Sequence, residues 1–77
     1  MISTKQIKAA RSLLGWTQKD LADKCYLSQV GINRLEKGVS DPKSSTLRII
    51  QAAFENEGII FINEENYEGV KLRTKGL

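Results

Sequence analysis

Four side chains suited to contacting DNA bases recur at helical spacing just after Ser28. They are Gln29, Val30, Asn33 and Arg34. A side-chain amide can form two hydrogen bonds with adenine, a guanidinium can do so with guanine, and valine can cover the methyl group of thymine. The spacing places the four on the helix face opposite Ile32 and Leu35, which suit a core. Each residue alone is more often merely solvated, but the set at the start of one helix predicts base readout in the major groove.

A second group of residues suits contacts with DNA phosphates. The group comprises Thr17, Gln18, Lys19, Ser28, Lys37, Lys43, Ser44 and Ser45. Many of them fall at predicted helix starts, where free N–H groups and the positive end of the helix dipole attract anions. For Thr17, Ser44 and Ser45 plain helix capping is the alternative, and a hydroxyl has enough hydrogen-bonding capacity for both roles. Phosphate contacts would position the protein without specifying a sequence.

The sequence offers few residues for other chemistry. It contains no histidine and a single cysteine, Cys25, so neither a disulfide within the chain nor an ordinary structural zinc site is expected. Cys25 stands in an apolar pattern and is interpreted as a small buried hydrophobe. Paired carboxylates in an apolar setting and a glycine-rich phosphate loop are also missing, so we expect no enzyme, no cofactor and no small-molecule ligand.

Charge is distributed unevenly along the 77 residues, whose formal net charge is +3. Residues 1–54 carry nine Lys and Arg against four Asp and Glu, and residues 55–77 carry three against five. A basic body attracts a polyanion, so nucleic acid is expected to bind before Phe54; a merely solvated surface is the alternative. The sequence lacks an apolar run of membrane-spanning length and the apolar core of a signal peptide, which predicts a cytoplasmic protein without a membrane partner.

Three predicted helices begin with the same device, a hydroxyl residue that caps the helix. Ser3 has Gln6 three residues later, and Thr17 has Asp20, as in a capping box; Ser28 begins the third helix. The first helix should end at Gly15 and bury one face, the second should end near Cys25, and the third should close at Gly38. The predicted buried face of the first helix consists of Ile7, Ala10, Leu13 and Leu14.

A fourth helix is expected after Pro42, capped by Ser44 or Ser45 and ended by Gly58. Its core face would carry Leu47, Ile50, Ala53 and Phe54. The chain thus divides into a domain at residues 1–57 and a C-terminal element at residues 58–77.

The C-terminal element has the pattern of a β-hairpin with a frayed end from residue 74. An apolar run and an alternating segment, residues 69–73, flank a turn-like stretch at residues 63–68. The apolar run consists of Ile59, Ile60, Phe61 and Ile62. Because a two-stranded hairpin would leave one of its faces wet, we expect these four residues to pack on the fourth helix and on a second subunit. Burial of all four within the monomer is the alternative.

Residues 3–57 resemble the phage-repressor and Cro-type helix-turn-helix family, also called the XRE family. The matching positions are Arg11, Leu14, Gly15, Thr17, Gln18, Leu21, Ala22, Leu27, Ser28, Ile32, Leu35, Glu36 and Gly38. The resemblance implies a mainly α, compact bundle of four or five helices of the lambda-repressor-like DNA-binding fold. It also implies that Gln18 contacts a phosphate and packs against Gln29, and that Arg11 and Glu36 form a structural ion pair. Where the family commonly has glycine after the second helix, this chain has Tyr26, so either the second helix ends differently or Tyr26 carries backbone strain.

These observations predict a sequence-specific, DNA-binding transcriptional regulator, most simply a repressor. It would bind a palindromic or pseudopalindromic operator in double-stranded DNA as a homodimer, through the helix that begins at Ser28. An antitoxin that regulates its own promoter is one alternative. The other is a protein-interaction module that has lost DNA binding and uses its C-terminal strand to extend the sheet of a partner.

Overall fold

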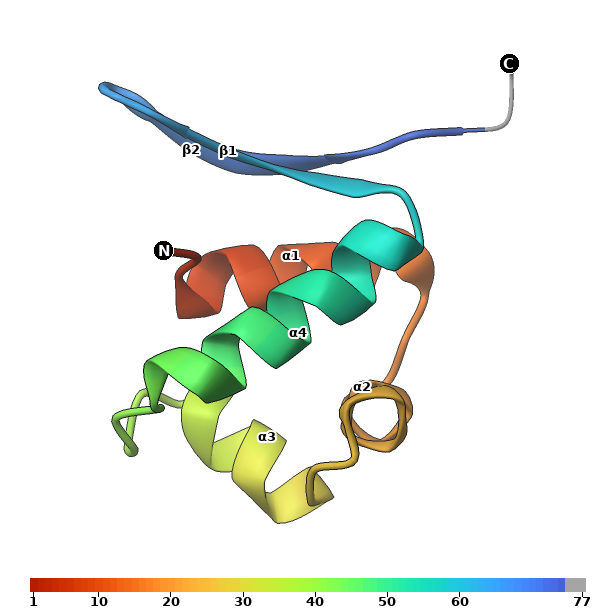
Figure 1. The fold of residues 1–77 in the computed structure, drawn as a ribbon, viewed down its shortest axis with the longest axis vertical. Coiled ribbons are helices and arrows are strands. Elements are labelled where there is room, and N and C mark those ends of the chain that lie inside the picture. The colour runs from red at the N-terminus through yellow and green to blue at the C-terminus, as the bar shows by residue number, and fades with distance from the viewer. Residues whose placement is uncertain (75–77) are drawn as a thin grey trace.

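The computed structural model describes residues 1–74, which form four helices followed by a two-stranded antiparallel hairpin (Figure 1). The elements are α1 (Thr4–Leu14), α2 (Gln18–Cys25), α3 (Gln29–Glu36), α4 (Ser44–Asn56), β1 (Ile59–Glu64) and β2 (Tyr67–Leu72). The predicted mainly helical fold with a C-terminal hairpin is confirmed, with four helices in this part of the chain. None of these helices is both long and apolar enough to cross a membrane. The predicted fraying begins at residue 74, and its remaining residues, 75–77, lie outside the described range.

The predicted caps of the first three helices are present. Ser3 and Thr17 each form a complete capping box, with Gln6 and Asp20 respectively. The prediction that Ser44 or Ser45 caps α4 is wrong. Lys43 is the N-cap residue, and its side chain makes no capping hydrogen bond. The helix begins at Ser44, one or two residues earlier than expected, so both serines lie inside it, where a hydroxyl no longer occupies the cap position.

Left-handed backbone conformations end the first two helices. Gly15 has φ 70° and closes α1, as predicted. Tyr26 occupies the same position after α2, with φ 56° and ψ 41°. This conformation brings Cβ of an L-residue close to the following carbonyl oxygen, which glycine avoids. Of the two alternatives for this position, the structure therefore shows a strained Tyr26.

The core lies where the four helices and the inner face of the hairpin meet. Its most buried members include Ile7, Leu21, Ile32, Ile50, Phe54 and Ile59. The Trp16 ring stacks on Phe54 with centroids 5.5 Å apart. Leu13, predicted on the buried face of α1, is instead 46% exposed. Since each residue turns the helix by about 100°, Leu13 lies about a quarter turn from Leu14, outside the stripe that the other elements cover.

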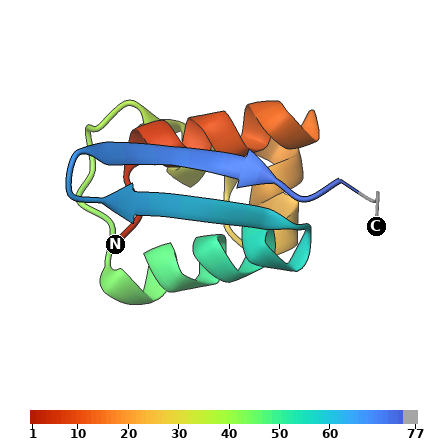
Figure 2. The same ribbon diagram turned by 90° about the horizontal axis from the view of Figure 1, so that it is seen from above.

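The hairpin lies over α1 and α4 with its strands running along these helices, β1 packed on α4 and β2 on α1 (Figure 2). The hairpin turn lies within the predicted stretch of residues 63–68 but occupies only residues 65 and 66, because the register pairs Asn63 with Glu68 and Glu64 with Tyr67. The strands therefore continue through these polar residues, and β2 begins at Tyr67. Backbone pairing does not require apolar side chains, so the change in composition marked the end of the core and not the end of the strands.

Gln6 attaches the hairpin to α1. Its side chain is only 1% exposed, and its Nε2 donates to the carbonyl oxygens of Ile62, at 3.1 Å, and Gly69, at 2.9 Å. Its Oε1 accepts a hydrogen bond from the backbone N–H of Ser3. The hydroxyl of Ser3 in turn donates to the carboxylate of Glu68. One buried amide thus closes the start of α1 and spans both strands of the hairpin.

We expect Gln6→Ala to lower the free energy of unfolding by about 2–3 kcal/mol, because it removes three hydrogen bonds and leaves a cavity. Urea denaturation measures this change. Gln51→Ala is the matched control, because Gln51 makes only a side-chain bond to Glu55 on the surface of α4, and we expect it to cost less than about 0.5 kcal/mol. Equal effects of the two substitutions would contradict the role given to Gln6.

Candidate nucleic-acid interface

The helix pair α2 and α3 lies at the end of the molecule opposite the hairpin (Figure 1). A short turn joins the two helices, and it is closed by a hydrogen bond of 2.9 Å from the N–H of Leu27 to the carbonyl oxygen of Ala22. The hydroxyl of Ser28 accepts from the N–H of Gly31 at 2.9 Å and so begins α3. These two hydrogen bonds hold the first turn of α3 in place at the surface of the molecule.

The predicted base-reading residues share the outer face of α3. Gln29, Val30 and Arg34 are exposed, Val30 to 69%, and Asn33 is half-buried. Gln29, Val30 and Asn33 line a hollow of about 250 Å³ together with Gln18 from α2. The structure thus brings three of the predicted base-reading residues together with Gln18, one of the predicted phosphate contacts.

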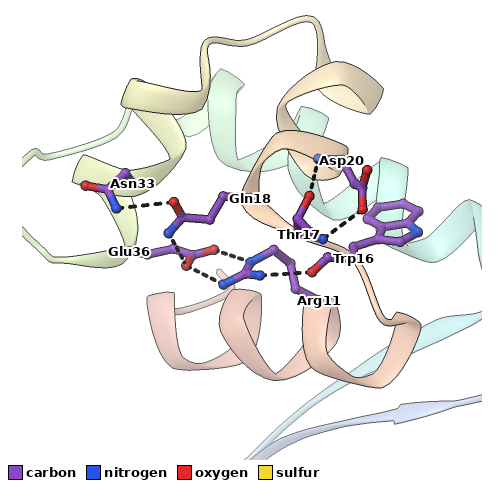
Figure 3. Close-up of polar contacts among 7 residues, drawn as sticks. All are labelled: Arg11, Trp16, Thr17, Gln18, Asp20, Asn33 and Glu36. Atoms are coloured by element: carbon purple, nitrogen blue, oxygen red, sulfur yellow. Dashed lines mark hydrogen bonds and ion pairs between the residues drawn. The ribbon is translucent and has the colours of Figure 1, made fainter.

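A chain of hydrogen bonds supports this face from behind (Figure 3). Arg11 binds both carboxylate oxygens of Glu36, from Nε at 2.7 Å and from Nη2 at 2.8 Å. Gln18 Nε2 donates to Glu36 Oε1 at 3.0 Å, and Asn33 Nδ2 donates to Gln18 Oε1 at 3.2 Å. A further bond of 2.9 Å joins Arg11 Nη1 to the carbonyl oxygen of Trp16. The ion pair implied by the family resemblance is present, and it is extended as far as the α3 surface.

Because Glu36 is buried, its charged state depends on the hydrogen bonds and positive charges around it. Glu36 is 4% exposed. Burial alone raises the pKa of its carboxyl, but hydrogen bonds from Arg11 and Gln18 and the nearby positive charges of Arg11 and Lys8 outweigh that effect, and the pKa is lowered overall. The hydrogen bond to Glu36 also raises the pKa of Arg11, against the opposing effect of burial. Both groups are therefore charged in the folded protein.

The Asn33 amide takes part in the internal hydrogen bonds and also keeps capacity for an external partner. One proton of its amide nitrogen goes to Gln18, while a second proton and the amide oxygen have the capacity to bind a base edge. Gln18 likewise keeps one amide proton beyond the one given to Glu36. The internal bonds therefore orient both amides without exhausting them.

Of the predicted phosphate contacts at the start of α2, Thr17 and Lys19 are exposed and Gln18 is half-buried, and all three already have partners within the protein. Thr17 Oγ1 accepts from the N–H of Asp20 at 3.0 Å, and the Asp20 carboxylate accepts from the N–H of Thr17 at 2.8 Å. These bonds to Thr17 lower the pKa of Asp20. Lys19 forms an exposed ion pair with Asp23, at 3.0 Å. Because a surface pair of this kind contributes little, Lys19 remains free to exchange Asp23 for a phosphate.

The start of α4 is more open to an anion. No side chain caps this helix, so the N–H groups of its first turn, next to exposed Ser44 and Ser45, are open to an external acceptor. Lys43 lines a hollow of about 360 Å³ together with Ser28, which brings the starts of α3 and α4 to one surface. Lys37, the C-cap residue of α3, is also exposed.

The four residues predicted to contact a second subunit divide between the two faces of β1. Ile59 is 2% exposed, and Phe61 packs edge-on against Phe54 with centroids 6.0 Å apart. Ile60, 42% exposed, and Ile62 alternate with them and face outward. Ile59 and Phe61 therefore belong to the core of the protomer, because alternate residues of a strand point to opposite faces.

Sequence reasoning missed the bond between Asn33 and Gln18. The spacing of each residue within its own helix was visible, but the contact depends on the angle between α2 and α3. Sequence reasoning also assigned Gln6 to capping alone, although an amide has more donors than the capping box uses.

A family model described as helix-turn-helix matches residues 7–57, which is more than half of the chain. The chain belongs to the helix-turn-helix family. The predicted resemblance to Cro-like and XRE-like proteins is confirmed, and at the level of this family the protein is a DNA-binding transcription regulator. The family is typically non-enzymatic. A search among curated proteins gave no match.

We expect Glu36→Gln to lower the free energy of unfolding at neutral pH by about 3 kcal/mol, because Arg11 is left partly buried without its counter-ion. The lowered pKa of Glu36 means that its contribution is present above the ordinary carboxyl pKa, about 4.3, and is lost as the pH falls below that value. Urea denaturation between pH 3 and 7 should show the two proteins converging at the acidic end. Asp23→Asn, which removes the exposed pair with Lys19, is the control. A constant difference from pH 7 to pH 3 would contradict this account.

Proposed function

We propose that this protein is a sequence-specific repressor that reads its operator with the outer face of α3. The observation that supports this most strongly is the presentation of Gln29, Val30 and Arg34 on a short, capped helix. This helix is tied to α1 and α2 through Glu36 and Asn33. Base readout requires side chains that are free at their tips and fixed at their backbone. The α3 helix meets both requirements.

Contacts with the DNA backbone are proposed on either side of this face. Gln18 and Lys19 would contact phosphates at the start of α2, and Lys43 with the uncapped first turn of α4 would do so at the other flank. Such contacts set the orientation of α3 in the groove, while the bases select the sequence. Bound in this way, the protein would repress by occupying DNA that other proteins need.

Two copies are proposed to bind an inverted repeat with half-sites about 34 Å apart, one turn of DNA. For both α3 helices to face one duplex, the symmetry axis must run from the hairpin end of the molecule to the α3 end. The copies would then meet side by side. Stacking of the outer hairpin faces through Ile60 and Ile62 would instead turn the two α3 helices in opposite directions, given the arrangement in Figure 1. We therefore propose that this face stays uncovered in the DNA-bound pair.

Selection of bound duplexes from a random DNA pool tests whether α3 reads the base sequence. The wild-type protein should enrich an inverted repeat, and Arg34→Ala and Gln29→Ala should each relax the preference at one position in each half-site. The expected loss is about 1–3 kcal/mol in discrimination per residue. The matched control is Arg73→Ala, which removes the same charge beyond the end of β2. If both α3 variants select the same DNA sequence as the wild type, the proposal is wrong.

Ile60→Glu tests the side-by-side arrangement. Ile60 lies opposite Lys71 in the hairpin register, so a glutamate there forms a cross-strand ion pair and keeps the strand stable while it removes the apolar contact. We expect this variant to occupy the selected inverted repeat with the same stoichiometry and with affinity within about twofold of wild type. Binding as a single copy would show that the outer hairpin face joins the two subunits.

A further inference from the structure

Tyr26 combines a strained backbone with an almost fully exposed side chain. Its φ of 56° makes it the one non-glycine residue with positive φ in residues 1–74. Its side chain contributes nothing evident to the core, because the residue is 95% exposed. Strain that persists without packing in return is typical of residues kept for function.

The position of Tyr26 relates it to the DNA-facing end of the molecule. It is the C-cap residue of α2 and stands two residues before Ser28, which caps α3. Its N–H bonds to the carbonyl oxygen of Asp23, and the adjacent N–H of Leu27 bonds to that of Ala22, so the turn is held in place. This turn lies at the end of the molecule away from the hairpin (Figure 1).

We propose that the Tyr26 hydroxyl donates a hydrogen bond to a phosphate oxygen at the edge of the groove that α3 enters. This inference rests on the proposed function. A phosphate fits better than a base, because Tyr26 precedes α3 and the side chains that face the bases begin at Gln29. Tyrosine hydroxyls are among the groups that contact DNA phosphates. The contact would be neutral on the protein side and would strengthen binding to every sequence.

Three variants separate this role from strain and from surface effects. Tyr26→Phe removes only the hydroxyl and keeps the strained backbone. Tyr26→Gly removes the side chain and relieves the strain. Tyr67→Phe is the matched control, because Tyr67 is 70% exposed on the hairpin at the other end of the molecule. Fluorescence anisotropy should measure binding to the duplex selected by the wild-type protein and to an unrelated duplex, each at several salt concentrations.

We expect Tyr26→Phe to weaken binding to both duplexes by a similar factor, about three- to tenfold. The slope of log affinity against log salt should not change, because a neutral donor releases no counterions. Tyr26→Gly should bind at least as weakly while its melting temperature rises by about 5 °C. Tyr67→Phe should bind like the wild type.

An affinity of Tyr26→Phe within about twofold of wild type, with the wild type still preferring its selected duplex, would overturn this inference and leave the proposed function standing. A wild-type protein that shows no preference between the duplexes would overturn the proposed function and this inference with it.

Discussion

The buried carboxylate of Glu36 constrains the geometry of the end of the molecule that α2 and α3 form. Glu36 is only 4% exposed, and a charged residue buried to this extent is tolerated only when an opposite charge and hydrogen bonds replace water. Arg11 supplies the counter-charge from α1, and Gln18 supplies a further hydrogen bond from α2. Because Glu36 lies on α3, satisfying one carboxylate fixes three helices relative to one another. The orientation of the outer face of α3 follows from that requirement.

A second buried polar group, the amide of Gln6, fixes the opposite end in the same manner. It satisfies two strand carbonyl groups and the N–H of Ser3, so the hairpin lies on α1 and α4 in one register. Across residues 1–74, every buried side-chain nitrogen and oxygen has a hydrogen-bond partner. In a chain of 77 residues, whose core is small, such directional bonds supplement apolar packing in selecting one arrangement.

The features that could be predicted from the sequence are those decided within a few residues. The caps at Ser3, Thr17 and Ser28 and the exposed face of α3 depend on local spacing. The predictions failed where contacts with other elements determine the structure. Leu13 is exposed because no other element covers its part of α1. The strands continue through Asn63 and Glu64 because their backbones pair with the opposite strand. The link from Asn33 to Gln18 needed the angle between α2 and α3. The residue type at Tyr26 limited the outcome to a different helix end or a strained backbone, and the choice between them needed the structure.

The most direct test of this account is the map of backbone amide NMR shifts when uniformly labelled protein is titrated with the selected duplex. We expect the shift changes to gather at the starts of α2 and α4 and along α3, while the amides of Ile60, Ile62 and Tyr67 on the outer hairpin face stay constant. Changes concentrated on the hairpin, with α3 unaffected, would show that DNA binds at the other end of the molecule and would contradict the account.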